Sequence, residues 1–365
     1  MTRPARVIID LPALRHNFNR VRQIAPRSRI IAVVKADAYG HGLLRTARTL
    51  AAADAFGVAC LEEAAQLREA DITNPILLLE GPYSASELPQ ITAWDLQIVV
   101  HDDSQIAMLE HARPPQPFKV WLKIDSGMHR LGFPPAETRR VWQKLMSLSS
   151  VAPGIRLMTH LATANEPDNP MTERQLQVFK SAGEGIEAER SSANSAGILL
   201  WPESHLDWVR PGLMMYGISP VEGKSSRELG LEPVMSLQSS LIAVKSLRRG
   251  DVVGYGASWF CPEDMRIGVV AAGYGDGFPR HSSSGCPILV KDIRTRITGH
   301  ASMDMLCVDL RNIPDVKVGD PVELWGAQLP IEEVASHAGT IPYELMCGIN
   351  KRLRCEEHGQ SENPL

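Results

Sequence analysis

The sequence has few of the features that mark membrane, secreted or nucleic-acid-binding proteins. No uncharged stretch approaches the length that spans a bilayer, and the apolar run near the N-terminus is short and has charges on both sides, unlike a signal peptide. The six cysteines are scattered and form no C-x-x-C pair, so we expect reduced thiols without a zinc site. The formal net charge of −4 provides no basic field for nucleic acid or an anionic membrane. These absences predict a cytoplasmic protein that acts on small molecules.

The sequence is instead that of a globular protein of about two domains. It has 365 residues, of which 44% are hydrophobic and 22% charged, and one core seldom extends over such a length. We expect a substantial buried core in each domain.

The first part of the chain alternates short apolar runs with helical patterns. Such alternation over residues 1–225 predicts a parallel (β/α)8 barrel, with a doubly wound sheet as the competing fold. The barrel is favoured because polar residues follow strand after strand, and the carboxyl ends of barrel strands converge on one site. Helical stretches between the runs, such as LEEAAQLREA (61–70), are expected to present solvated charged faces. The eight candidate strands are 29–34, 55–59, 75–80, 96–100, 118–124, 155–161, 191–196 and 207–218.

The sequence pattern changes after Pro220, where the alternation of apolar runs and helical stretches ends. The polar stretch 221–232 is typical of a linker, and residues 226–365 contain short apolar runs separated by turns, which predicts a mostly β-strand domain with one late helix at 329–339. We expect hairpin-type turns at 249–251 and 318–320, where glycine is followed by aspartate.

Three segments of the barrel region suggest a phosphate-bearing aldehyde. Lys35 ends an apolar run and opens the stretch KADAYGHG, where a desolvated amine could form a Schiff base. The stretches 194–197 and 210–213 offer hydroxyl and glycine backbone groups to phosphate oxygens near the late strands, where barrels commonly bind phosphate. Arg210 lies inside an apolar segment and requires a fixed acceptor, which a cofactor ring nitrogen would provide.

The motifs of the whole chain resemble those of the alanine racemase family, the fold-type III enzymes that use pyridoxal 5′-phosphate (PLP). The matching stretches span residues 32 to 345 in family order: AVVKADAYGHG, WLKIDSGMHRLGF, the histidine of THLATA, RPGLMMYG, VGYGASW, AAGYGDGFPR, GHASMDM and PYEL.

The resemblance implies a two-base racemisation of alanine. Lys35 would bind PLP covalently and act as the base for the D-enantiomer, and Tyr255 from the partner subunit of a homodimer would act on the L-enantiomer. His160 and Arg210 would assist Tyr255, with Arg210 facing the pyridine nitrogen. D-alanine made in this way would supply bacterial peptidoglycan, although a catabolic enzyme would have the same motifs.

The resemblance also implies the binding residues. Arg130 and the backbone N–H of Met303 would bind the substrate carboxylate, and Lys123, if carbamylated, would orient Arg130; a simple ion pair of Lys123 with Asp125 is equally compatible with the sequence. The remaining implied contacts form two groups. PLP would be bound by Lys35, Tyr39, His160, Ser195, Arg210, Gly212, Leu213 and Tyr343, and the gate to the site would be formed by Tyr274, Asp304 and Tyr343. No metal is implied.

Three other functions fit parts of the pattern. A PLP-binding homeostasis protein would have the barrel alone, without Tyr255 and the GYGDG stretch. A fold-type III decarboxylase would share the barrel and the lysine but lack SMDM, and would have a carboxylate near the pyridine nitrogen. A racemase of broader amino-acid scope is not separated from an alanine racemase by sequence, because side-chain tolerance depends on the gate geometry.

Overall fold

The computed structural model describes residues 3–282 and 284–359. The chain divides into two compact units. The barrel unit comprises Arg15–Met215 and Ser219–Leu231, and the β-rich unit comprises the segment up to Leu14, Tyr216–Ile218 and the segment from Glu232 onward. Strand β1 (Arg6–Asp10), although it lies within the predicted first domain of residues 1–225, therefore belongs to the β-rich unit.

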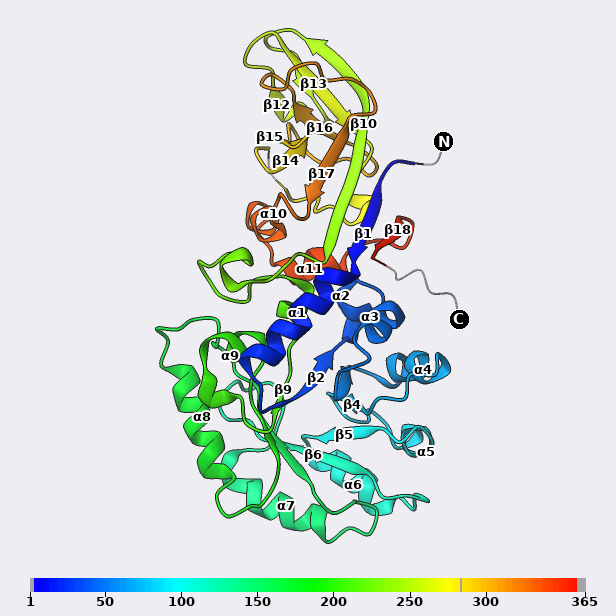
Figure 1. Cartoon of the computed structure of the whole chain (residues 1–365), viewed down its shortest axis with the longest axis vertical. Coiled ribbons are helices and arrows are strands. Elements are labelled where there is room, and N and C mark those ends of the chain that lie inside the picture. The colour runs from blue at the N-terminus through cyan, green and yellow to red at the C-terminus, as the bar shows by residue number, and fades with distance from the viewer. Residues whose placement is uncertain (1–2, 283, 360–365) are drawn as a thin grey trace. The chain divides into compact units, whose positions relative to one another are not determined.

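The barrel unit contains a closed barrel of eight parallel strands in chain order, which confirms the predicted fold. Helices lie outside the strands (Figure 1). The strands are β2 (Arg29–Val33), β3 (Ala55–Val58), β4 (Ile76–Leu78), β5 (Gln97–Val100), β6 (Lys119–Lys123), β7 (Arg156–Met158), β8 (Arg190–Ser191) and β9 (Trp208–Val209). The outer helices include α3 (Leu43–Thr49), α4 (Leu61–Glu69), α5 (Leu88–Ala93), α6 (Asp103–His111), α7 (Thr138–Met146) and α8 (Met171–Ala182).

Side chains from successive strands fill the barrel interior. Ile31, Leu77 and Val99 form one buried cluster with Trp121 and Trp208, whose rings meet edge to face with centroids 5.7 Å apart. The interior is thus a packed core, and polar chemistry is confined to the strand ends.

The last two strands are shorter than the sequence predicted. The side chain of Asn194 accepts a hydrogen bond from the Gly197 N–H and caps α9 (Ser195–Leu200), so the run 191–196 turns from strand to helix. Pro211 has no N–H for a sheet ladder, and a short 3-10 helix, η4 (Leu213–Tyr216), replaces the rest of the run 207–218.

The β-rich unit is built around a long strand, β10 (Met235–Leu247). The main sheet has the order β15 (Ile293–Arg296), β14 (Pro287–Val290), β17 (Pro321–Trp325), β10, β1 and β18 (Arg354–His358). Strand β13 (Met265–Val270) pairs with β10 and with β16 (Leu306–Asp309), and β11 (Val252–Val253) with β12 (Trp259–Phe260). The domain is mostly β-strand, as the sequence predicted, and α10 (Ile331–His337) lies within the helix expected at 329–339. A second helix, α11 (Pro342–Cys347), was not predicted.

The two expected hairpin turns are real turns but do not connect paired strands. Strand β10 pairs with β1, β13 and β17 rather than with β11, and β16 pairs with β13 rather than with β17. A tight hairpin instead joins β14 to β15 through Lys291 and Asp292, both with positive φ (52° and 61°), as a two-residue turn of this kind requires. Among the described residues, no helix has both the length and the apolar character needed to cross a membrane.

Candidate active site

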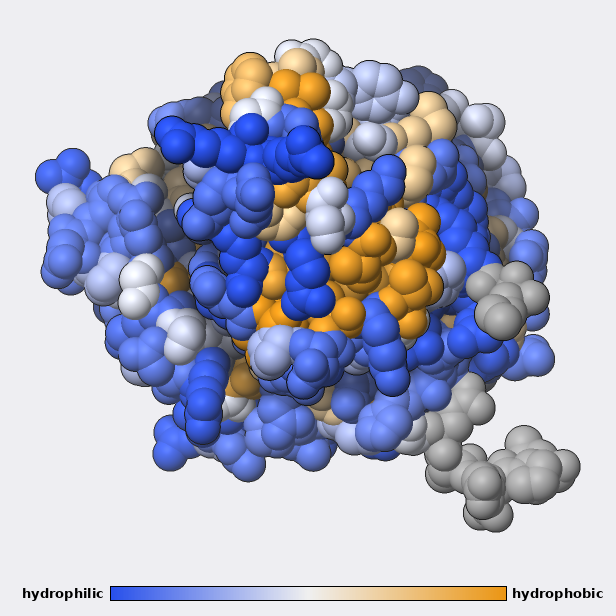
Figure 2. Space-filling view, turned by 90° about the horizontal axis from the view of Figure 1, so that it is seen from above, coloured by the Kyte–Doolittle hydropathy of each residue, from blue (hydrophilic) through white to orange (hydrophobic). Residues whose placement is uncertain are grey.

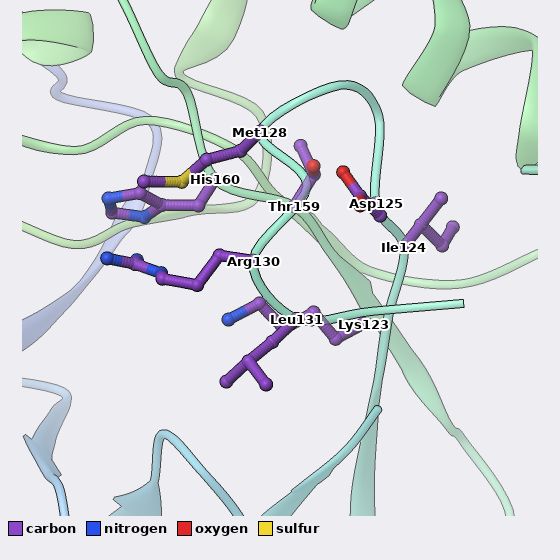
Figure 3. Close-up of a pocket in the computed structure, with 8 residues that line it drawn as sticks. All are labelled: Lys123, Ile124, Asp125, Met128, Arg130, Leu131, Thr159 and His160. Atoms are coloured by element: carbon purple, nitrogen blue, oxygen red, sulfur yellow. The ribbon is translucent and has the colours of Figure 1, made fainter. Parts of the chain in front are cut away.

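Basic side chains gather at the carboxyl ends of the barrel strands. Lys35 follows β2, Lys123 ends β6, Arg130 lies in the next loop, His160 follows β7 and Arg210 follows β9. Lys123, Arg130 and His160 line one pocket, and their side chains extend to the same side of it (Figure 3). All five residues were predicted site residues, and the barrel topology brings them together from four strands.

Arg210 is the most firmly held member of this cluster. Its side chain is 5% exposed, and its guanidinium donates to the Ser191 hydroxyl and, from Nη2, to the Thr159 carbonyl at 2.5 Å. The same nitrogen lies 3.5 Å from Nδ1 of His160. Burial lowers the pKa of Arg210 to about 10, so the guanidinium is still a cation at neutral pH.

The cations lower the basicity of their neighbours. Burial, followed by the charges of Arg210, Lys123 and Arg130, holds the pKa of His160 well below its usual value, so His160 is neutral at pH 7. A neutral ring can accept the Arg210 N–H at Nδ1. Burial and the same group of cations lower the pKa of Lys123 to about 8. The cluster is therefore an environment that favours anions.

Lys35 has an acidic neighbour that was not among the predicted site residues. Oε1 of Glu80, in the loop after β4, lies 3.7 Å from the Lys35 amine, and its other carboxylate oxygen accepts from the Tyr83 hydroxyl. Glu80 is the last residue of the predicted strand 75–80, and in the closed barrel β3 separates β4 from β2.

The chain reverses its handedness directly after Lys35. Ala36, Asp37, Ala38 and Tyr39 all have positive φ, between 51° and 55°, and form a left-handed helical turn. For residues with a side chain this conformation costs roughly 1–2 kcal/mol each. Such concentrated strain occurs where the surrounding structure imposes a geometry, and here it sets the direction in which Lys35 and Tyr39 leave the strand.

Three side chains stabilise the left-handed turn. The Glu63 carboxylate of α4 accepts the Ala36 N–H at 2.6 Å and the Ala59 N–H at 2.8 Å. Asp37 accepts the Leu43 N–H at 2.7 Å, and fully buried His41 binds turn carbonyls through Nδ1. The expectation that the charges of LEEAAQLREA are simply solvated was therefore wrong for Glu63.

Three of the predicted phosphate ligands are direct neighbours. The hydroxyl of buried Ser195 accepts hydrogen bonds from the N–H groups of Gly212 (2.9 Å) and Met214 (3.3 Å). A methyl group added at Gly212 would lie 2.6 Å from the Tyr39 hydroxyl oxygen, so that only glycine permits this approach. Leu213 follows Gly212 directly, and the group forms a cradle of hydroxyls and backbone.

The other predicted site residues belong to the β-rich unit. Tyr255 is 73% exposed and lies in a short turn between glycines of positive φ, Gly254 and Gly256. Tyr274 lies in η7 (Tyr274–Asp276) and Tyr343 in α11, and both are partly exposed. The remaining two predicted site residues of this unit, Met303 and Asp304, lie in one exposed loop before β16.

Comparison with known proteins assigns both units to one family. The chain matches the family model of the alanine racemase N-terminal domain over residues 9–220 and that of the alanine racemase C-terminal domain over residues 234–356. The chain belongs to the alanine racemase family. It is 52% identical over 349 residues to the alanine racemase of Nitrosococcus oceani, which covers 95% of this chain and 97% of that protein.

Solved structures of the alanine racemase family have the same fold. The biosynthetic alanine racemase of Pseudomonas aeruginosa superposes with a TM-score of 0.96 at 44% identity, over 98% of this chain and all of that one. The alanine racemase of Bartonella henselae, whose structure contains covalently bound pyridoxal phosphate, superposes with a TM-score of 0.88 at 27% identity, over 98% of this chain and all of that one.

Proposed function

We propose that this member of the family is a PLP-dependent racemase that interconverts L-alanine and D-alanine. The observation that carries the proposal is Lys35, set by a strained left-handed turn at the end of β2 and facing a cluster of cations. The family membership of both units supports the same reaction.

The residues at the barrel end fit PLP. The cradle of Tyr39, Ser195 and Gly212 offers hydroxyl and backbone groups to a phosphate, Lys35 offers an amine to the aldehyde, and buried Arg210 offers a fixed donor to the ring nitrogen. His160, Leu213 and Tyr343 complete the proposed set of contacts. PLP, when bound, acidifies the α-proton of an amino acid by delocalising the electron pair that proton removal leaves. Covalent PLP in the Bartonella enzyme supports the assignment.

The side chains of this chain would then move the proton. The Lys35 amine takes or returns the α-proton on one face, for the D-enantiomer, and the Tyr255 hydroxyl does so on the other face, for the L-enantiomer. Arg130 and the Met303 N–H bind the substrate carboxylate, and the guanidinium fork matches its two oxygens. Tyr274, Asp304 and Tyr343 form the gate that limits substrate size.

The position of Tyr255 supports a homodimer with shared sites. Besides Tyr255, the β-rich unit exposes other large apolar side chains, among them Val252, Phe260, Met303 and Met305. Figure 2, a view onto the end at which Figure 1 draws β12 and β13, shows hydrophobic residues gathered among hydrophilic ones. Exposed apolar surface of this kind is typical of an interface, and a second copy would cover it and place Tyr255 in the partner's site.

Lys123 is proposed to react with carbon dioxide. Its pKa of about 8 leaves part of the amine neutral at pH 7, and the neutral amine can add to carbon dioxide, forming an N–C bond and releasing a proton. The resulting anion would neutralise the cation cluster and orient Arg130. The alternative partner, Asp125, accepts N–H groups of Gly127 and His129 instead, and no ion pair joins it to Lys123 in the described part of the chain.

Protein incubated with carbon-13 bicarbonate is therefore expected to show a carbamate signal by nuclear magnetic resonance. Replacing Lys123 with alanine should remove the signal. The matched variant Lys119→Ala should retain it, because Lys119 lies at the other end of β6, paired with Asp95. No carbamate signal in the unaltered protein would contradict the proposal.

Replacing Gly212 with alanine is expected to weaken PLP binding at least about tenfold, because the new methyl group must displace the Tyr39 hydroxyl from the cradle. The affinity can be measured by titrating cofactor-free protein with PLP. Tyr39→Phe alone should also weaken binding, and adding it to Gly212→Ala should cause little further loss, because both changes remove the same hydroxyl from the cradle. Unchanged affinity in Gly212→Ala would show that the phosphate does not bind here.

The proposed reaction is tested by absorbance and isotope exchange. The purified protein should have an absorption band above 400 nm, about 420 nm for PLP linked to a lysine, which borohydride removes, and in deuterated water it should convert L-alanine to D-alanine with deuterium at the α-carbon. If the band is present but alanine is not racemised, the binding of PLP is supported and the proposed reaction is rejected. Comparing the racemisation of alanine with that of serine distinguishes an alanine racemase from a racemase of broader scope.

The biosynthetic enzyme of P. aeruginosa supports a role in supplying D-alanine for peptidoglycan.

A further inference from the structure

The β-rich unit contains a fully buried carboxylate, that of Asp276, at the end of the turn that carries Tyr274. Both of its oxygens are bonded. Oδ1 accepts from Arg3 Nη1 and, at 2.9 Å, from Arg352 Nε; Oδ2 accepts from Arg3 Nη2 at 2.6 Å and from the Gly273 N–H at 2.9 Å. One carboxylate thus connects the N-terminal segment, the C-terminal segment and the Tyr274 turn.

Both arginines extend beyond Asp276 to the loop of Met303 and Asp304. Arg3 Nη2 donates to the Asp304 carbonyl at 3.2 Å. Arg352 Nη2 donates to the Met303 carbonyl at 3.3 Å and lies 2.9 Å from the Asp304 carboxylate. Asp276, Arg3 and Arg352, here called the Asp276 network, therefore hold the loop that carries the proposed substrate-binding N–H.

The loop and the turn also contact each other through their backbones. The Tyr274 N–H donates to the Ser302 carbonyl at 3.0 Å, and the Gly275 N–H to the Met303 carbonyl at 2.8 Å. A side chain at Gly273 would lie 2.5 Å or less from the carbonyl oxygens of Ser302 and Met303, so the approach depends on glycine. The Met303 N–H itself donates no hydrogen bond to any described residue, and remains available to a ligand.

From these contacts we propose that the Asp276 network is the positioning device of the substrate-carboxylate site: it fixes the Met303 N–H and Tyr274 relative to each other. The proposal rests on the proposed racemase function. None of its three residues needs to touch the substrate, since each acts through the loop or the turn that it holds.

The charges of the network suit this role. Burial tends to raise the pKa of the Asp276 carboxyl, but the hydrogen bonds from Arg3 and Gly273 outweigh burial and keep the pKa below its usual value. The carboxylate stays ionised, and ionised hydrogen bonds in a buried site are short and directional. A rigid support of this kind is what a substrate-binding backbone group requires, because displacement of such a group by about 1 Å can cost about 100-fold in rate.

The first test replaces Asp276 with asparagine, which retains the size and removes the charge. We expect the KM for both alanine enantiomers, and the inhibition constant of propionate, which is alanine without its amine, to rise at least about tenfold. Asp309→Asn is the matched control, because Asp309 is also buried (5% exposed) and bonded to Arg311, but its arginine does not reach the loop. The control should lose stability without a rise in KM.

The second test does not depend on the folding of Asp276→Asn. Arg3→Gln and Arg352→Gln remove partly exposed side chains. Each should raise KM and the propionate constant, and should speed amide hydrogen exchange in residues 300–306 of the cofactor-free protein, whereas Arg3→Lys and Arg352→Lys should recover part of both effects.

The outcomes separate this inference from the proposed function. If the unaltered protein does not racemise alanine, the proposed function fails, and hydrogen exchange alone still decides whether the network holds the loop. If the unaltered protein is active and the glutamine variants retain its KM, propionate constant and exchange rates, the positioning role is rejected and the racemase remains.

Discussion

Replacing Lys35 with alanine is expected to slow racemisation by about 10⁴-fold or more in both directions. Inversion needs one base to remove the α-proton and another to return it on the opposite face, so loss of either base stops both directions. Lys35 also supplies the amine that would hold PLP. The measurement is the rate at which each enantiomer of alanine forms the other.

Isotope exchange tests directly whether Lys35 removes the α-proton of D-alanine or that of L-alanine. In deuterated water with added PLP, Lys35→Ala should still exchange the α-hydrogen of L-alanine, because Tyr255 remains, but should not exchange that of D-alanine. Lys119→Ala, which removes an exposed lysine at the other end of the barrel, should behave as the unaltered protein. Exchange of D-alanine by Lys35→Ala would contradict the assigned role.

The order of the barrel strands was predictable because each strand leaves a local signal. Runs such as RIIAVV are buried on both faces of the strand and flanked by helical periodicity, and their alternation identifies a parallel fold. The lengths of β8 and β9 were not predictable from hydrophobicity, since Asn194 and Pro211 end these strands by capping a helix and by withholding a donor.

The left-handed conformation of the strained residues after Lys35 could not be predicted from the sequence. Of these four residues only Asp37 is of a type that adopts positive φ readily, while Ala36, Ala38 and Tyr39 are not. The turn depends on Glu63, 27 residues further along the chain from Ala36. Asp276 poses the same difficulty, because its partners Arg3 and Arg352 come from opposite ends of the chain. Motifs indicated the residues with proposed chemical roles, whereas the residues that support them became apparent only from long-range contacts.

Replacing Tyr255 with phenylalanine is expected to lower the racemisation rate by about 10³-fold or more, since it removes one hydroxyl and the proton it exchanges. The exposed ring surface is retained, so assembly should not change. In deuterated water this variant should exchange the α-hydrogen of D-alanine through Lys35 and leave that of L-alanine in place, the reverse of Lys35→Ala. Phe260→Leu, which alters exposed apolar surface in the neighbouring strand β12, is the control and should retain exchange of both enantiomers.

The two variants together test whether the sites are shared. When Lys35→Ala and Tyr255→Phe chains carry different tags and are purified through both, each mixed dimer should contain one site with both defects and one with neither. Such dimers should recover about half of the activity of the unaltered protein, although both parent variants are inactive. If each chain instead uses its own Tyr255, every site retains one defect and the mixture stays inactive. Activity in the mixed dimer would therefore establish that Tyr255 acts in the partner's site.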